Sequence, residues 1–204
     1  MNYAQLAFTD TIKKIQEEAG SRNSYDRVEK MSVVDGLTDN EIRFIGDRDS
    51  FYMASFGENE YPYIQHRGGP AGFIKVIDNK TIGFVDFSGN RQFISTGNIS
   101  KNENVALILM SYPQRARLKI YAHAKTVDLK DHEALYERLK PEDYKFRPER
   151  MMIFEIQAYD WNCPQHITPR YTTEEVEEAL LPQKKYINDL ENKIKELELK
   201  LADK

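Results

Sequence analysis

The stretch that decides the fold runs from residue 117 to residue 127 and reads Arg-Leu-Lys-Ile-Tyr-Ala-His-Ala-Lys-Thr-Val. Small or aliphatic side chains occupy every second position in most of it: Leu118, Ile120, Ala122 and Ala124. A period of two places successive side chains on opposite faces of a β-strand. The stretch therefore predicts a strand with one buried face of small side chains and one basic face.

Other short runs rich in β-branched and aromatic residues lie on both sides of this strand: 51–56, 61–65, 73–77, 81–87, 105–110 and 152–158. Residues 57–60 and 78–80 are connections of hairpin length, so we expect the first four runs to form an antiparallel meander. About seven strands follow one another with few helices between them. This order favours a mainly β protein, an antiparallel barrel with flanking helices, over alternating βαβ units.

Helices are predicted around the β-rich centre. Apolar residues recur at helical spacing over residues 4–19, and residues 131–139 are expected to form a crossover helix. Thr38 stands three residues before Glu41, the spacing of a capping box, which predicts a helix over residues 38–48.

The chain changes character again beyond Pro182. Apolar residues recur there at alternating steps of three and four: Ile187, Leu190, Ile194, Leu197 and Leu201. This heptad pattern favours a two-stranded coiled coil over a helix that packs its stripe on its own domain. We therefore divide the chain into an N-terminal helix and loop (1–37), a barrel (38–170) and a C-terminal helical, coiled-coil extension (171–204).

Composition excludes several classes of protein. The 29 Lys and Arg against 33 Asp and Glu give a net charge of −4, which disfavours a general nucleic-acid binder. No stretch approaches the roughly 18 consecutive apolar residues of a membrane span, and charged residues such as Lys13 and Glu17 stand where a signal peptide would be apolar. We expect a cytoplasmic protein. Cys163 is the single cysteine and cannot form an intramolecular disulfide, and neither His123 nor His132 has a partner at metal-ligand spacing, so no metal is expected.

Polar residues gather at the ends of predicted strands, in residues 63–70, 88–92 and 95–98. Arg67 and Arg91 occur there with hydroxyl and amide donors and with glycines that let backbone N–H groups approach a ligand. This composition suits a phosphate monoester. The alternative is that these segments are ordinary turns with surface arginines.

Taken in order, four segments resemble a known family: 51–55, 62–70, 83–92 and 160–166. The chain resembles the FMN-binding split barrel of the pyridoxamine 5′-phosphate oxidase-like superfamily. Within it, the chain is similar to a branch of uncharacterised flavin-nucleotide-binding proteins. The resemblance covers about residues 38 to 166.

The resemblance implies a homodimer with FMN in the cleft between the subunits. It places Gln65, His66 and Arg67 toward the flavin and its ribityl chain, and it makes Arg91 the clamp on the phosphate. Trp161 would reach the flavin region from the partner subunit. The implied cofactor-binding set is Gln65, His66, Arg67, Ser88, Asn90, Arg91, Gln92, Ser95, Trp161 and Gln165.

The sequence departs from the pyridoxamine phosphate oxidases themselves at two places. Gln92 follows Arg91 where their phosphate motif has lysine, and their C-terminal arginine-leucine-histidine run is absent. Oxidation of pyridoxamine phosphate is therefore disfavoured. The leading hypothesis is an FMN-dependent oxidoreductase of an unknown small substrate, with no catalytic residue assigned. The alternative is a non-catalytic flavin- or haem-binding module whose coiled coil docks a partner.

Overall fold

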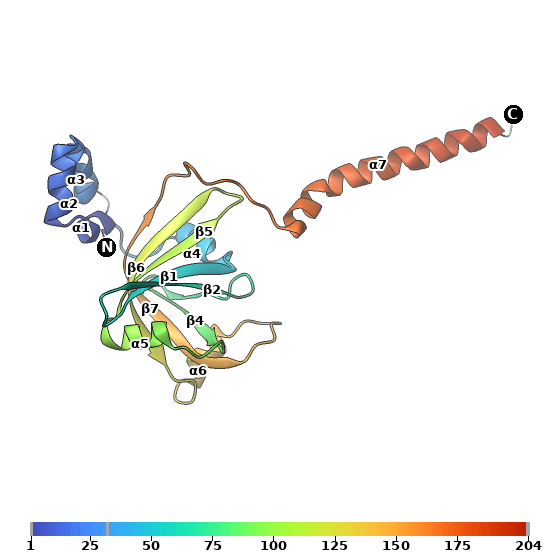
Figure 1. Ribbon diagram of the computed structural model, residues 1–204. Coiled ribbons are helices and arrows are strands. Elements are labelled where there is room, and N and C mark those ends of the chain that lie inside the picture. Colours follow the sequence, from blue (N-terminus) through green and yellow to red (C-terminus); the bar gives the residue numbers. More distant parts are fainter. Residues whose placement is uncertain (1, 32, 203–204) are drawn as a thin grey trace.

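The computed structural model describes residues 2–31 and 33–202, and this part of the chain contains one seven-stranded antiparallel sheet (Figure 1). The strands are β1 (Ser50–Phe56), β2 (Pro62–Gly68), β3 (Lys75–Asp78), β4 (Thr81–Phe87), β5 (Asn104–Ser111), β6 (Ala116–Val127) and β7 (Pro148–Trp161). Their order across the sheet is β2-β1-β5-β6-β7-β4-β3. The predicted fold class, a mainly β antiparallel split barrel with flanking helices, is confirmed.

The predicted meander of the first four strands is wrong. The hairpins β1-β2 and β3-β4 both form, but β2 and β3 lie at opposite edges of the sheet and β4 pairs with β7. The connection between β2 and β3 folds back over the start of β1, where Gly69 N–H donates to Asp49 O at 2.8 Å. Residues 82–86 of β4 are buried on both faces, which suits a place beside the long strand β7 rather than in an exposed hairpin ladder.

The core confirms the period-two reading of β6. Leu118, Ile120, Ala122 and Ala124 are each at most 2% exposed. They pack in the main core cluster with residues of the neighbouring strands and with a group of stacked and edge-on phenylalanines: Phe51, Phe73, Phe84 and Phe154. A smaller cluster around Val85 and Leu139 lies where α6 (Glu133–Leu139) contacts β4.

The helix predicted at the capping box is confirmed as α4 (Asp39–Gly46). Thr38 Oγ1 accepts from the N–H of Asn40 at 3.3 Å, while Glu41 Oε2 accepts from the N–H of Thr38 at 2.9 Å. The helix α5 (Ile94–Lys101), which follows β4 after a short turn, was not predicted. Its residues include glycine, serine and asparagine, which are weak helix formers, so propensity gave no signal.

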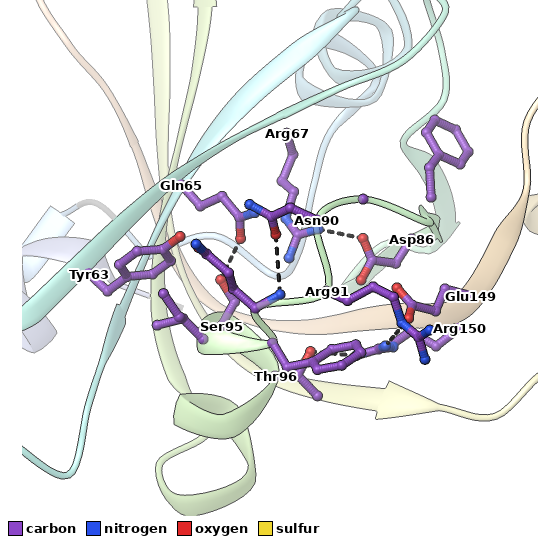
Figure 2. Close-up of a pocket in the computed structure, with 15 residues that line it drawn as sticks. Tyr63, Gln65, Arg67, Asp86, Asn90, Arg91, Ser95, Thr96, Glu149 and Arg150 are labelled. Atoms are coloured by element: carbon purple, nitrogen blue, oxygen red, sulfur yellow. Dashed lines mark hydrogen bonds and ion pairs between the residues drawn. The ribbon is translucent and has the colours of Figure 1, made fainter.

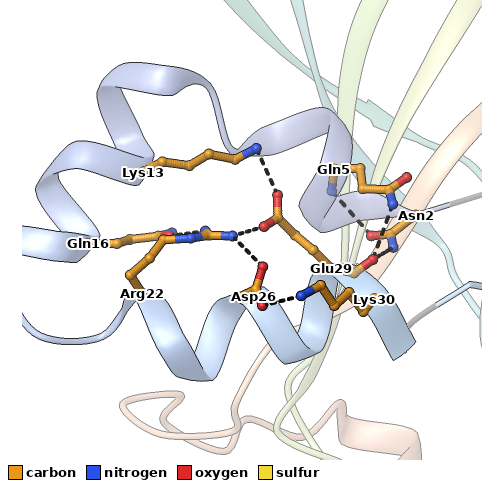
Figure 3. A network of polar contacts seen from close by, with 8 residues as sticks. All are labelled: Asn2, Gln5, Lys13, Gln16, Arg22, Asp26, Glu29 and Lys30. Atoms are coloured by element: carbon orange, nitrogen blue, oxygen red, sulfur yellow. Dashed lines mark hydrogen bonds and ion pairs between the residues drawn. The ribbon is translucent and has the colours of Figure 1, made fainter.

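The N-terminal segment differs from the single helix predicted over 4–19. It forms α1 (Tyr3–Ala7), α2 (Asp10–Glu18) and α3 (Arg22–Met31). Figure 3 shows that α3 is held by polar contacts, which apolar periodicity in the sequence does not predict. Its buried residue is Glu29, 7% exposed, which ion-pairs with Arg22 and with Lys13 Nζ at 3.2 Å. The Lys13–Glu29 ion pair joins α2 to α3. The Asn2 side chain, at the N-cap of α1, donates a hydrogen bond to the carbonyl of Glu29.

The C-terminal helix α7 (Thr173–Ala202) projects away from the barrel (Figure 1). It begins at a second capping pair, in which Glu175 N–H donates to Thr172 Oγ1 at 3.1 Å and Thr172 N–H donates to Glu175 Oε2 at 2.8 Å. None of its residues is buried. Across the described residues, no helix has both the length and the apolar character needed to cross a membrane.

Candidate functional site

A pocket lies where β2, the turn after β4, the start of α5 and the start of β7 meet (Figure 2). Alternation along β2 points three side chains toward it: Tyr63, Gln65 and Arg67. The turn contributes Asn90, Arg91, Gln92 and Phe93, and β7 contributes Glu149 and Arg150. Segments from three parts of the sequence therefore form one polar hollow.

Arg67 is the most buried cation of the pocket, with a side chain only 14% exposed. Its guanidinium forms an ion pair with Asp86, which is itself 4% exposed. Burial raises the pKa of the Asp86 carboxyl, and the positive charges of Arg67 and Arg150 oppose that rise. Arg67 Nε is buried and finds no hydrogen-bond acceptor among the residues that the structure describes. The pocket therefore holds a buried donor that an incoming acceptor could satisfy.

The turn after β4 is held in a conformation that few side chains adopt. Arg91 and Phe93 both have positive φ, at 60° and 56°. Asn90 Oδ1 accepts from the N–H of Gln92 at 3.2 Å, which fixes the turn locally. The Phe93 ring lies 5.8 Å from the Arg91 guanidinium carbon and 4.9 Å from that of Arg150. The Phe93 ring therefore makes cation–π contacts with both guanidinium groups at the mouth of the pocket.

The N-terminus of α5 opens onto the same hollow. Phe93 is the N-cap and offers no side-chain hydrogen bond, and the first helical bond runs from Gly97 N–H to Phe93 O at 2.8 Å. Amides of the first turn have no partner within a helix and favour an anion. Ser95 Oγ donates to Gln65 Oε1 at 2.6 Å, and Arg150 donates to Thr96 Oγ1 at 2.6 Å. These bonds tie the helix start to β2 and β7.

The charges of the pocket suit an anionic ligand. Its described lining carries the cations Arg67, Arg91 and Arg150 against the carboxylates Asp86 and Glu149. The lining also offers amide, hydroxyl and guanidinium donors beside the unpaired Arg67 Nε–H, and guanidinium groups bind phosphate oxygens in pairs. This donor set fits the phosphate of a nucleotide cofactor such as FMN.

The structure brings together six of the predicted cofactor-binding residues. The pocket is lined by Gln65, Arg67, Asn90, Arg91, Gln92 and Ser95. Ser88 lies just outside the lining, where its N–H donates to Arg147 O at 2.9 Å. His66 projects from the opposite face of β2 and lies edge-on to Tyr52, with ring centroids 5.3 Å apart.

Trp161 and Gln165 lie at the other end of the barrel. The Trp161 indole N–H donates to Glu41 Oε1 at 2.6 Å, and its ring packs against Phe44. Gln165 is exposed in the loop after β7. Ten residues of β7 lie between Arg150 and Trp161, so the two are eleven residue steps apart, about 36 Å of extended strand. The two ends of β7 therefore do not meet in one chain.

Sequence reasoning missed Asp86, Phe93, Glu149 and Arg150. The first two lay within the quoted motif or beside it but carried no expected role. The other two were missed because β7 was predicted to start at residue 152, whereas it starts at Pro148. The sequence Arg147-Pro148-Glu149-Arg150 was the available signal, since it ends two residues before the first residue of the predicted strand.

The described residues offer no group of three or more His, Cys, Asp or Glu side chains arranged to hold a metal ion. His123 Nδ1 lies 3.5 Å from Glu103 Oε1, and both side chains are exposed. The exposed pair is a surface contact.

Comparison with known families gives the class of protein. Residues 37–160 match the family model described as pyridoxamine 5′-phosphate oxidase, which covers more than half of the chain. The protein therefore belongs to the pyridoxamine 5′-phosphate oxidase family, and the resemblance noted in its sequence is confirmed. No curated protein sequence matches.

Several solved structures are similar to this chain at low sequence identity. HupZ of Group A Streptococcus is 12% identical, with 66% of this chain and 100% of that chain covered at a TM-score of 0.49. An FMN-binding protein from Syntrophomonas wolfei is 11% identical, covering 72% and 97% at 0.46. A Clostridium acetobutylicum protein related to general stress protein 26, of the pyridoxinephosphate oxidase family, is 14% identical, covering 67% and 94% at 0.43.

Proposed function

We propose that the protein binds FMN with the phosphate in the pocket between β2, α5 and β7. The observation that carries this proposal is the buried Arg67 Nε without an acceptor, beside two further arginines and the open N-terminus of α5. Family membership supports it, and one structural neighbour is described as an FMN-binding protein.

Different residues of the pocket would bind different parts of FMN. Arg67, Arg91 and Arg150 would supply positive charge for the phosphate, and the amides at the start of α5 would add dipolar stabilisation. The Ser95–Gln65 hydrogen bond, with Tyr63 further along β2, provides polar groups for the ribityl hydroxyls. When bound, FMN supplies the redox chemistry, while the protein anchors and orients it.

A homodimer with the cofactor at the subunit interface forms part of the proposal. The outer face of β1, β2 and β5 carries exposed apolar side chains beside the pocket strand: Tyr52 and Ile64 are 39% and 67% exposed, and Ala54, Ala106 and Ile108 lie beside them. His66 projects from this same face of β2. Pairing this face with a second copy would bury the apolar group and bring His66 into the interface.

In the proposed dimer, Trp161 and Gln165 could contact the flavin of the other subunit, although they cannot reach the pocket of their own chain. Because they lie at the far end of β7 from the pocket, they can reach a flavin only from the partner subunit. The loop that carries Gln165 is held in place, since Arg115 donates to Pro164 O at 3.3 Å and Ile167 is buried. A fixed loop of this kind suits contact with a neighbouring subunit.

We further propose that the flavoprotein is an oxidoreductase acting on a small substrate, with no catalytic residue assigned. Gln92 lies in the pocket beside Arg91 and supplies no second charge there, which continues to disfavour pyridoxamine phosphate as the substrate. A module that binds flavin without turnover is the competing function.

The absorption spectrum of the purified protein tests this proposal. We expect flavin bands and one FMN per chain after reconstitution. Steady-state reduction by NADH or NADPH, with and without electron acceptors, then separates an oxidoreductase from a binding module. A protein that neither carries nor takes up FMN would contradict the cofactor assignment, and a bound flavin that no donor reduces would contradict the enzymatic one.

A further inference from the structure

The C-terminal helix α7 carries an apolar stripe that packs on nothing in the described chain. Ile187 and Ile194 are each 54% exposed, and the helix has no buried residue. Most of the stability of a protein helix comes from packing its apolar face, and a helix alone in water is only marginally stable. The stripe therefore requires a partner surface.

The residues of the stripe specify the type of partner. In heptad positions labelled a to g, Ile187, Ile194 and Leu201 occupy a, and Leu190 and Leu197 occupy d. Isoleucine at a with leucine at d favours two parallel strands over higher assemblies. The composition of the seam thus points to one further helix of the same kind.

The flanking charges select a second copy of this chain. Position e holds Glu191 and Glu198, and position g holds Lys193 and Lys200. In a parallel pair each g residue faces an e residue of the next heptad, so Lys193 faces Glu198 of the partner subunit, twice by symmetry. In an antiparallel pair g would face g and e would face e, which sets lysine against lysine and glutamate against glutamate.

We propose that residues 183–202 form a parallel two-stranded coiled coil with the same segment of a second copy. The paired segment starts after Pro182, which lacks an N–H and interrupts the helical ladder. A parallel coil has its two-fold axis along the coil, and an isologous barrel dimer is also two-fold symmetric. The same pair of chains can therefore make both contacts, although the coil does not depend on flavin binding.

Disulfide cross-linking of the full chain tests the proposal. In a Cys163→Ser background, Leu201→Cys places the two new thiols in the same a layer of a parallel pair. We expect a disulfide-linked dimer in a glutathione redox buffer. Asn192→Cys, at the outward f position, is the matched control and should stay monomeric on a non-reducing gel. Failure of Leu201→Cys to cross-link above this control would overturn the proposal, because the stripe would then belong to a different partner or an antiparallel pair.

Charge reversal in the Leu201→Cys chain tests the register. Lys193→Glu should lower the equilibrium cross-linking constant about fivefold, because it places glutamate opposite Glu198 of the partner subunit. Adding Glu198→Lys should restore the parent value, since opposite charges again face each other. In an antiparallel pair the single reversal replaces lysine opposite lysine with glutamate opposite glutamate. An unchanged constant in Lys193→Glu, or no recovery in the double variant, would contradict the parallel register.

Discussion

At the scale of single residues, Arg91 lies at positive φ in the turn beside α5 and lines the proposed phosphate pocket. We expect Arg91→Ala to weaken FMN binding by about 1.5–3 kcal/mol, the range for a hydrogen bond to a charged group, or roughly tenfold to a hundredfold in Kd. Riboflavin, which lacks the phosphate, should bind the variant as it binds the parent. Flavin fluorescence quenching measures both affinities.

Arg27 provides the matched control, because it is an arginine exposed on α3. Arg27→Ala should leave both affinities at the parent value. If Arg91→Ala bound FMN as tightly as the parent, the phosphate would have to lie elsewhere, and the assignment of Arg91 would be wrong.

Glu41 is the second residue with a sharp expectation. Its carboxylate accepts hydrogen bonds from Thr38 N–H, from Trp161 Nε1 at 2.6 Å and from the Tyr159 hydroxyl at 3.2 Å. Burial acts to raise the pKa of Glu41, but the hydrogen bonds from Thr38 and Trp161 outweigh it and the pKa is lowered. We expect Glu41→Ala to lower the free energy of unfolding by about 2–3 kcal/mol, because buried donors lose their acceptor.

The pH dependence of that loss follows from the lowered pKa. The carboxylate stabilises the fold fully above its ordinary value of 4.5, and this contribution is lost as pH falls through the lower folded pKa. Urea unfolding at several pH values should therefore show that the difference in unfolding free energy between the parent and Glu41→Ala becomes smaller in acid. A difference in unfolding free energy that became larger in acid would contradict the lowered pKa of Glu41.

At the scale of elements, β4 and β7 pack so closely that Gly83 has no room for a side chain. A Cβ there would lie 2.7 Å from Ile153 Cδ1 and 3.1 Å from Met152 O. Gly83→Ala should cost about 1–3 kcal/mol of unfolding free energy. Gly97→Ala, in α5 with nothing within 4 Å, is the control and should stabilise by about 0.5–1 kcal/mol. Equal effects in thermal unfolding would show that β4 is not packed as described.

The helix α7 should be separable from the flavin site. Removal of residues 183–204 is expected to leave a folded barrel that still binds FMN, because α7 buries no residue against the rest of the chain. Size-exclusion chromatography with absorbance at flavin wavelengths measures both properties. Loss of flavin together with the tail would show that the helix contributes to the site.

Prediction from sequence succeeded for elements whose pattern is local. The alternation in β6 predicted its buried face, and Thr38 with Glu41 predicted the start of α4, because both signals depend on near neighbours. The helix α3 had no such signal, since its buried residue is Glu29, which pairs with Arg22 at the start of the same helix and with Lys13 on α2. Strand order also escaped prediction, because β4 pairs with β7 over more than sixty residues of sequence.

At the scale of the whole molecule, the candidate site was only partly predictable. The motif residues Arg67 and Arg91 meet in one pocket, but Arg150 joins them only because β7 begins beside α5. Trp161 lies at the other end of the same strand, which could not be known before the length of β7 was seen. Any contact of Trp161 with the flavin therefore requires the assembled dimer.

The most direct test of the central claim is a comparison of FMN and riboflavin binding to the unmodified protein. We expect FMN to bind at least about tenfold more tightly than riboflavin, because only FMN carries the phosphate that the arginines and the α5 amides would hold. Titration followed by quenching of flavin fluorescence gives both dissociation constants. Equal affinity for the two flavins would contradict a phosphate site in this pocket.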